Sequence, residues 1–280
     1  MKHDRFCIFI LSHGRADNVV TVKTLKRCGY TGDVVIVCDD EDDQLAEYEK
    51  KFPMVEVFSK SKVKCDTMDL TGSDKIVLFA REQTPIIAKK LGYKYFLVLD
   101  DDYTSFQIRH PVDGRLRGHE VKNLDRVIDA YLDFMENTPT TTIAFAQGGD
   151  YICGLGNGSM WKPKRKAMNA FFCDIDRPFH FLGRINEDTN MNLEEGRKGK
   201  LIFTLLLGGI MLTQKTTQKN AGGLTDIYLE VGTYRKSFYS VMINPAAVKI
   251  SLMGDKHMRI HHHINWRYAV PKILDEEYKK

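Results

Sequence analysis

The chain has 280 residues, of which 43% are hydrophobic and 28% charged, and its formal charge is +4 at pH 7. This composition allows one substantial core and excludes a disordered or highly charged chain. The mild positive charge permits an anionic partner without requiring one. None of the six cysteines belongs to a CxxC pair, so we expect reduced thiols in a reducing compartment.

Short apolar runs alternate with helical patterns over the first hundred residues. Strands are predicted at residues 6–11, 34–38, 55–59 and 95–99, and helices at residues 18–28, 41–52 and 76–91. Pro85 puts the continuity of the third helix in question. Residues 119–136 carry the clearest amphipathic helical pattern, and residues 143–146 form the next predicted strand. The alternation predicts an α/β fold with a mostly parallel sheet covered on both faces.

The second half of the chain has a different texture. Five glycines fall between positions 148 and 158, which indicates a loop around a site, and residues 201–207 form a predicted buried strand. We expect one domain over residues 1–280, with a nucleotide-sugar half at 1–107 and an acceptor half at 108–280. The longest apolar run, residues 201–212, is too short to span a bilayer. With no export signal at the N-terminus, we expect a soluble cytoplasmic protein without a membrane partner.

Polar clusters follow three of the predicted strands. They are Ser12-His13-Gly14-Arg15, Asp39-Asp40 and Asp100-Asp101-Asp102. Each could be a solvated turn, but ligands of parallel α/β sheets bind at the carboxyl ends of the strands, where all three would converge.

The aspartate triplet carries the strongest signal. Three adjacent carboxylates repel one another unless a positive group compensates them, and a hard divalent cation takes oxygen ligands. In an extended segment, Asp100 and Asp102 point to the same side and can share one metal and its bound sugar nucleotide. An acidic turn at the end of a strand is the alternative.

At this point the chain resembles a known family. An apolar strand that ends in DxD looks like the GT-A class of glycosyltransferases. The wider pattern, listed in chain order, is FCIFILSHGRADN, VVIVCDDEDD, Ala80-Arg81, YFLVLDDDY, INEDTN and HHHINWRYAVPKIL. This pattern most resembles the TET-associated glycosyltransferases of bacteriophages, which implies a GT-A-like fold, a UDP-sugar donor, and Mn²⁺ or Mg²⁺. It also implies a hydroxymethylated pyrimidine in DNA as the acceptor, in the host cytoplasm if the protein is phage-encoded.

The resemblance also implies roles for residues at the donor site. Ser12 and Arg15 would lie beside the nucleotide and its phosphates. Asp39 or Asp40 would accept a hydrogen bond from the base, which would then be a uracil or a similar ring. Arg81 would reach the diphosphate or an acidic neighbour, although surface ion pairing is the alternative for both arginines. Asp100 would contact the ribose, Asp101 would belong to the same donor site, and Asp102 would ligate the metal.

Two later motifs complete the predicted catalytic apparatus. In Asn186-Glu187-Asp188-Thr189, Asp188 is the predicted general base that takes the acceptor proton, with Glu187 as the substitute. The same four residues are also a plausible helix start, and a retaining mechanism stays open if Asp188 is not the base. In the cluster 261–263, His262 is the predicted additional metal ligand, although the sequence does not distinguish the three histidines.

Two basic stretches suggest contact with DNA. Trp161, Lys162, Lys164 and Arg165 combine an aromatic face with cations, which can stack on an unstacked base and neutralise phosphates. A second stretch contains Arg109, His110, Arg115, Arg117 and His119. A solvated run of charges is the alternative for both. The glycines at 154, 156 and 158 do not form a complete GxGxxG motif, and we interpret them as a loop near the donor or acceptor.

The sequence therefore predicts a metal-dependent glycosyltransferase that modifies a DNA base. The alternative is the same fold acting as a glycosyltransferase or nucleotidyltransferase on a saccharide or another acceptor that is not DNA. A non-catalytic DNA-binding module is disfavoured, because clustered carboxylates would repel phosphate without a metal. The sugar, the stereochemical outcome and the oligomeric state are not predicted.

Overall fold

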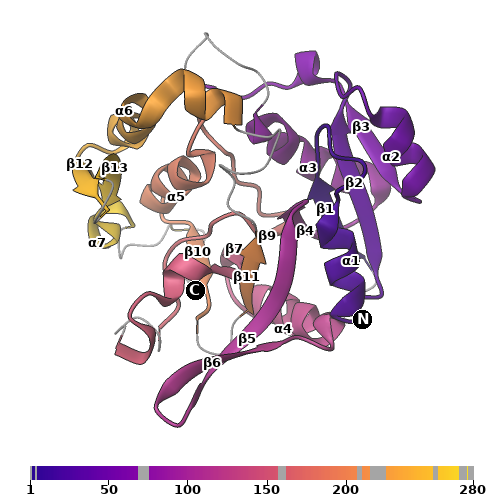
Figure 1. Cartoon of the computed structure of the whole chain (residues 1–280), viewed down its shortest axis with the longest axis horizontal. Helices are drawn as coiled ribbons and strands as arrows, with labels where there is room; N and C mark the ends of the chain where they lie inside the picture. The colour runs from indigo at the N-terminus through magenta and orange to yellow at the C-terminus, as the bar shows by residue number, and fades with distance from the viewer. Residues whose placement is uncertain are drawn as a thin grey trace.

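A seven-stranded sheet forms the centre of the protein in the computed structural model, which describes residues 2–3, 5–68, 76–156, 162–206, 210–214, 225–254, 258–270 and 276 (Figure 1). The strand order is β10-β7-β9-β4-β1-β2-β3. Strands β1 (Phe6–Leu11), β2 (Asp33–Asp39), β3 (Val55–Phe58) and β4 (Tyr95–Asp100) are mutually parallel, and β10 (Leu201–Thr204) is parallel to β7 (Thr140–Ala144). Strand β9 (Phe171–Asp174) runs antiparallel to both of its neighbours.

Helices cover both faces of this sheet, as the continuous apolar strands predict. All six residues of β1 are buried, and alternate residues belong to opposite cores. Phe6, Ile8 and Ile10 pack with side chains of α1 (Val20–Arg27), α2 (Leu45–Lys51) and α4 (Leu124–Asn137). Cys7, Phe9 and Leu11 pack with side chains of α3 (Val77–Leu91), α5 (Glu187–Arg197) and α6 (Thr225–Ile243). The predicted mostly parallel α/β fold is thus confirmed.

Helix α3 continues through Pro85 without a break. Proline has no N–H to donate to the carbonyl four residues earlier, which here belongs to Arg81. The hydroxyl of Thr84 donates to that carbonyl at 2.8 Å instead, so the acceptor is satisfied. Gly92 then ends the helix in the left-handed conformation, with φ of 83°.

The prediction of a helix over residues 119–136 was wrong at its start. Residues 119 and 120 belong to β6 (Arg115–Glu120), which pairs with β5 (Tyr103–Val112) in a long hairpin. Asp113 and Gly114 turn the hairpin with φ of 48° and 69°, which is the role that an Asp-Gly pair favours. Helix α4 starts later, where the side chain of Asn123 accepts a hydrogen bond from the backbone of Arg126.

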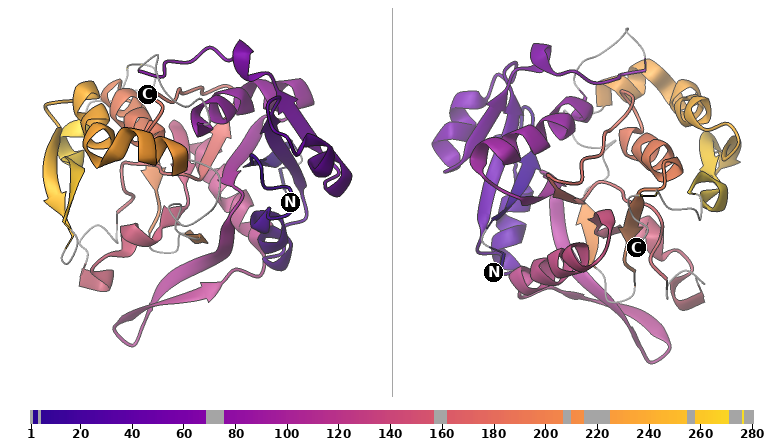
Figure 2. Two further views of the ribbon diagram at one scale, coloured as in Figure 1. Left: turned by 45° about the horizontal axis from the view of Figure 1, so that its top comes forward. Right: turned by 180° about the vertical axis from the view of Figure 1, so that it is seen from behind.

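A second sheet and a C-terminal unit complete the described structure (Figure 2). The second sheet has the order β6-β5-β11-β8, with β8 at Ala146–Gln147 and β11 at Ile210–Gln214. Short 3-10 turns lie at Lys60–Lys62, Gly148–Tyr151 and Gly154–Gly156. The chain then forms α6, the hairpin of β12 (Val248–Met253) and β13 (Arg259–Ile264), and α7 (Trp266–Ala269). All six cysteines are free thiols. No helix in the described part of the chain is long and apolar enough to cross a membrane.

Candidate active site

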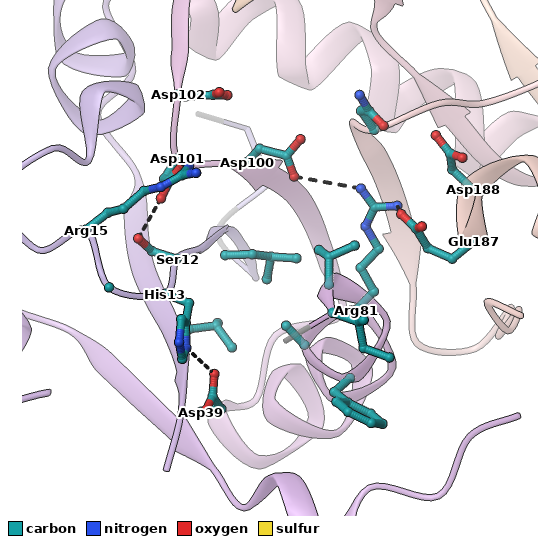
Figure 3. Close-up of a pocket in the computed structure, with 18 of the residues that line it drawn as sticks. Ser12, His13, Arg15, Asp39, Arg81, Asp100, Asp101, Asp102, Glu187 and Asp188 are labelled. Carbon is teal, nitrogen blue, oxygen red and sulfur yellow. Dashed lines mark hydrogen bonds and ion pairs between the residues drawn. The ribbon is translucent and has the colours of Figure 1, made fainter. Parts of the chain in front are cut away.

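A pocket of about 760 Å³ opens at the carboxyl ends of β1, β2 and β4, where the sequence predicts a site (Figure 3). The starts of α3 and α5 line it from the other side, together with residues of α6 and β13. Most of the predicted donor, metal and catalytic residues line this one cavity: Ser12, Arg15, Asp39, Arg81, Asp100, Asp101, Asp102, Glu187, Asp188 and His262.

The three aspartates of the triplet have different surroundings. Asp101 turns toward β1, where its carboxylate accepts from Ser12 at 2.7 Å and from Arg15 at 2.9 Å. Asp100 and Asp102 extend toward the opposite wall (Figure 3). Burial raises the pKa of Asp100 to about 7, the charge of Arg81 opposes that rise, and the neighbouring aspartates add to it. The Asp101 carboxylate is therefore paired with Arg15, and Asp100 lies near the guanidinium of Arg81. A cation in the cavity would further offset the charge of the adjacent carboxylates.

Ser12 and Arg15 thus both donate hydrogen bonds to the middle aspartate of the triplet. The Ser12 hydroxyl also lies 2.8 Å from the hydroxyl of Tyr48, which in turn accepts from the backbone N–H of Arg15. This network anchors the turn after β1 against the turn after β4. The contact of Ser12 and Arg15 with the nucleotide and its phosphates stays a prediction.

Arg81 bridges the two walls of the pocket from a buried position. Its side chain is 2% exposed, and its guanidinium carbon lies over the rings of Phe171 and Phe181, at 5.2 and 5.3 Å from their centroids. One guanidinium nitrogen donates to Glu187 at 2.6 Å, and another lies 3.7 Å from Asp100. The sequence predicts either the diphosphate or an acidic neighbour as the partner of Arg81, and the structure shows acidic neighbours.

Glu187 and Asp188 are adjacent but have different environments. Glu187 is buried against Arg81; burial raises its pKa to about 7, and the Arg81 charge opposes that rise. Asp188 is half-buried and lines the cavity. Within the described residues, its carboxylate accepts one hydrogen bond, from the backbone N–H of the adjacent Thr189 at 2.6 Å. Helix α5 begins at Glu187, so the motif is also the helix start that was its alternative interpretation. Asp188 is thus the better-placed candidate base.

Asn186 holds the turn before this helix. Its backbone is left-handed, with φ of 57°, and its side-chain amide donates to the carbonyl of Lys236 in α6 at 2.7 Å. Lys236 also lines the cavity. Sequence reasoning did not find this lysine, because α6 carries no local signal that places it beside a site formed 50 residues earlier.

The far end of the pocket is built around Asp39. Its carboxylate lies 2.7 Å from His13 Nδ1 and 3.3 Å from Lys60 Nζ. Burial alone would raise the pKa of Asp39, but the hydrogen bond and charge of His13, together with Lys60, lower it to about 2. Asp39 therefore stays ionised, and His13 and Lys60 are functional candidates that the sequence did not single out.

Asp40 does not share this position, so Asp39 is the better placed of the two for the predicted contact with the base, which stays a prediction. Asp40 is exposed, does not line the cavity, and accepts from the backbone N–H of Lys60 at 2.9 Å. Consecutive residues at a strand end point to opposite sides, so only one of the two aspartates can face the pocket.

The residues predicted to bind a metal suit a divalent cation in their chemistry. His261 and His262 line the cavity, whereas His263 is exposed and does not. Nδ1 of His262 is buried without a hydrogen-bond partner in the described structure. Burial, together with the charges of His261 and Lys236, lowers the pKa of His262 to about 4, so the ring is neutral as ligation requires.

Asp102 and His262 are not gathered into a preformed cluster. Among the described residues, only His3, Asp133 and Glu136 bring three ligand atoms within 4.8 Å of one another, and they lie outside the pocket. A neutral imidazole and carboxylate oxygens form a donor set that Mn²⁺ accepts. The ligand assignment of Asp102 and His262 therefore stays a prediction that the chemistry of both side chains fits.

Two lysines of the basic run at 162–166 form ion pairs within the protein. Lys164 Nζ lies 3.3 Å from the buried carboxylate of Asp150 and 2.9 Å from its carbonyl, and Lys166 lies 2.6 Å from the same carboxylate. Arg165 is half-buried over the ring of Phe203 at 5.4 Å. Lys162 is exposed, and Trp161 lies outside the described residues. Lys164 thus has an ion-pair partner within the protein and Arg165 packs on an aromatic ring, and the contact of these residues with DNA stays a prediction.

Comparison with known proteins identifies the class as a glycosyltransferase. The family model described as TET-Associated Glycosyltransferase matches residues 6–223, and the chain belongs to this family. The predicted family and the predicted enzyme class are thereby confirmed. No curated protein matches the sequence at a significant level.

Two solved structures are similar to the chain. Glucosyl-3-phosphoglycerate synthase from Mycobacterium tuberculosis, in complex with Mn²⁺, UDP and phosphoglyceric acid, has a TM-score of 0.45 and 9% identity; the match covers 92% of this chain and 86% of that one. S. aureus TarS 1-349 has a TM-score of 0.42 and 14% identity, covering 74% of this chain and 59% of that one.

Proposed function

We propose that this glycosyltransferase moves a sugar from a UDP-sugar to the hydroxymethyl group of a modified pyrimidine in DNA. The observation that carries the proposal is one cavity that holds Asp100 and Asp102 on one wall and Asp188 on the other. Membership of the TET-associated family supports DNA as the acceptor. The mycobacterial synthase, whose structure contains Mn²⁺ and UDP, suggests the same donor and metal types here.

The donor would lie across the ends of β1, β2 and β4. Asp39 is ionised and can accept from the N–H of a uracil ring, with His13 and Lys60 holding its carboxylate in place. Asp100 would contact the ribose. Asp102 and His262 would hold a divalent cation, which would offset the charge that builds up on the leaving diphosphate.

Asp188 would act on the acceptor. As the hydroxymethyl oxygen forms its bond to the anomeric carbon, the bond from that carbon to the diphosphate breaks, and the acceptor proton passes to the Asp188 carboxylate. Lys236 lines the cavity on the same side and contributes a positive charge near Asp188. Because the base in a duplex is inaccessible, the acceptor nucleotide would be flipped into the pocket.

The test is transfer of radiolabelled sugar from several UDP-sugars, with Mn²⁺ or Mg²⁺, to DNA containing 5-hydroxymethylcytosine or 5-hydroxymethyluracil and to unmodified DNA. Label on hydroxymethylated DNA alone is the expected result. Metal-dependent release of UDP without label on any DNA would refute the acceptor and move it to a saccharide or another molecule. Absence of UDP release would refute the donor.

A further inference from the structure

The hairpin of β5 and β6 extends away from the body of the protein (Figures 1 and 2). Its two faces differ in burial. One face packs inward. Leu116 on this face packs against Ala146, Tyr151 and Leu206, and the guanidinium of Arg109 lies 5.8 Å from the Tyr151 ring centroid. These contacts fix the hairpin as a defined element.

On the opposite face, the outward side chains of β6 are exposed and basic. Because side chains alternate along a strand, Arg115, Arg117 and His119 share this face of β6, and all three are exposed. His110 lies opposite Arg117 on β5, and its ring stacks on that of His119 at 4.8 Å. We call these four residues the arm face. Within the described residues, Arg115 and Arg117 have no ion-pair partner, and Glu120 is held on the other face by Arg27 and Lys122.

We propose that the arm face binds the phosphates of duplex DNA that flanks the base being modified; this inference rests on the proposed DNA acceptor. The major groove of B-DNA admits a two-stranded β-ribbon, and the arginine guanidinium matches phosphate geometry. Edge strands also carry charge to prevent unwanted pairing, but that purpose does not require one sign. The charged side chains of the arm face are all positive, and the face is therefore complementary to a polyanion.

The position of the arm relative to the pocket sets which DNA it contacts. Strand β5 begins at Tyr103, immediately after Asp102 in the pocket. In the strand register, His119, Arg117 and Arg115 lie opposite Ile108, His110 and Val112. At about 3.3 Å per residue, these positions lie roughly 17 to 30 Å along the strand from Tyr103. A duplex rises about 3.4 Å per base pair, so the contacts fall roughly five to nine base pairs from the flipped base.

The experiment compares R115Q/R117Q with the wild-type protein and with K50Q/K89Q as a matched control. Lys50 and Lys89 are also exposed, but they lie on α2 and near the end of α3, away from the hairpin. Binding to a hydroxymethylated duplex of about 30 base pairs is measured from 0.05 to 0.2 M salt. Sugar transfer is measured on the same duplex and on a trinucleotide that carries the same base.

Loss of two phosphate contacts should lower the slope of log K against log salt by about 1.8, at about 0.9 per contact. Duplex affinity should fall roughly tenfold or more at 0.15 M salt, while the control binds as the wild type does. Transfer to the trinucleotide should be unchanged in both variants, because it is too short to reach the arm. This last result also shows that the pocket is intact.

Two outcomes would overturn the inference in distinguishable ways. If the wild type transfers sugar to the duplex and R115Q/R117Q matches K50Q/K89Q in affinity and slope, the arm face does not bind DNA and the proposed function survives. If the wild type releases UDP but neither binds nor labels DNA, the acceptor assignment and the arm proposal both fail.

Discussion

Replacing Arg81 by methionine tests whether the buried guanidinium holds the two walls of the site together. The substitution retains an unbranched apolar side chain against Phe171 and Phe181 but removes the charge. Because Arg81 is 2% exposed and lies 2.6 Å from the buried Glu187, its loss leaves an uncompensated carboxylate inside the protein. Breaking a buried pair from one side costs about 3–5 kcal/mol. We expect R81M to lose that much free energy of unfolding.

The assay is urea unfolding, followed by circular dichroism, of the wild type, R81M, E187Q and R81M/E187Q. Removing the Glu187 charge as well should return about 1–3 kcal/mol to R81M, since residues in contact are not additive. The folded-state pKa of Glu187, about 7, exceeds its unfolded value, so stability falls as pH rises from about 4.5 through 7. Without the opposing Arg81 charge, R81M should lose more between pH 6 and pH 8 than the wild type. A loss below about 1 kcal/mol, or additive single variants, would refute the bridging role.

Three further predictions concern the cavity. D102A should abolish transfer and metal-dependent donor binding with an unchanged circular dichroism spectrum; activity near the wild-type rate would refute the metal assignment. D188N should bind donor normally but lose at least about 10²-fold in kcat, and normal turnover would exclude Asp188 as the base. H13Q should lose up to about 1 kcal/mol, because His13 is a third exposed and solvent screens its pairing with Asp39. The pKa of His13 is raised and that of Asp39 is lowered to about 2, so this loss should be largest between about pH 4 and 6.5 and shrink as the pH rises further. A loss of unfolding free energy that grows toward pH 8.5 in urea unfolding would contradict this prediction.

The sheet was predictable from the sequence because its strands are apolar throughout. Residues 6–11 and 95–99 are buried on both faces, and such runs have one stable arrangement in an alternating α/β chain. Residues 107–120 were harder, since their side chains are partly or fully exposed and mix polar with apolar types. The amphipathic stripe beginning at Val121 extended the predicted helix backward over the last two residues of β6. The Asp113-Gly114 turn was the local signal that could have corrected this prediction.

The site was predictable where chemistry is concentrated and less so where the partner is distant in sequence. The carboxylates at the ends of β2 and β4 converge because parallel strands end at one edge. The sequence could not choose between Asp39 and Asp40, since the choice depends on the pleat at the strand end. It also could not show that Lys164 is paired with Asp150, because a buried aspartate fourteen residues away looks the same in sequence as an exposed one.

Glu187 and Asp188 are adjacent in sequence but differ in burial and in the groups that they contact. The first residue of α5 points to Arg81 and, through it, to Asp100 on the opposite wall, whereas the second is half-buried at the cavity. A displacement of Asp100 would therefore change the position of Arg81 and of Glu187 at the start of α5, next to Asp188. If Asp188 is the base, as proposed, the buried Glu187 acts as a positioning residue for the helix that carries it.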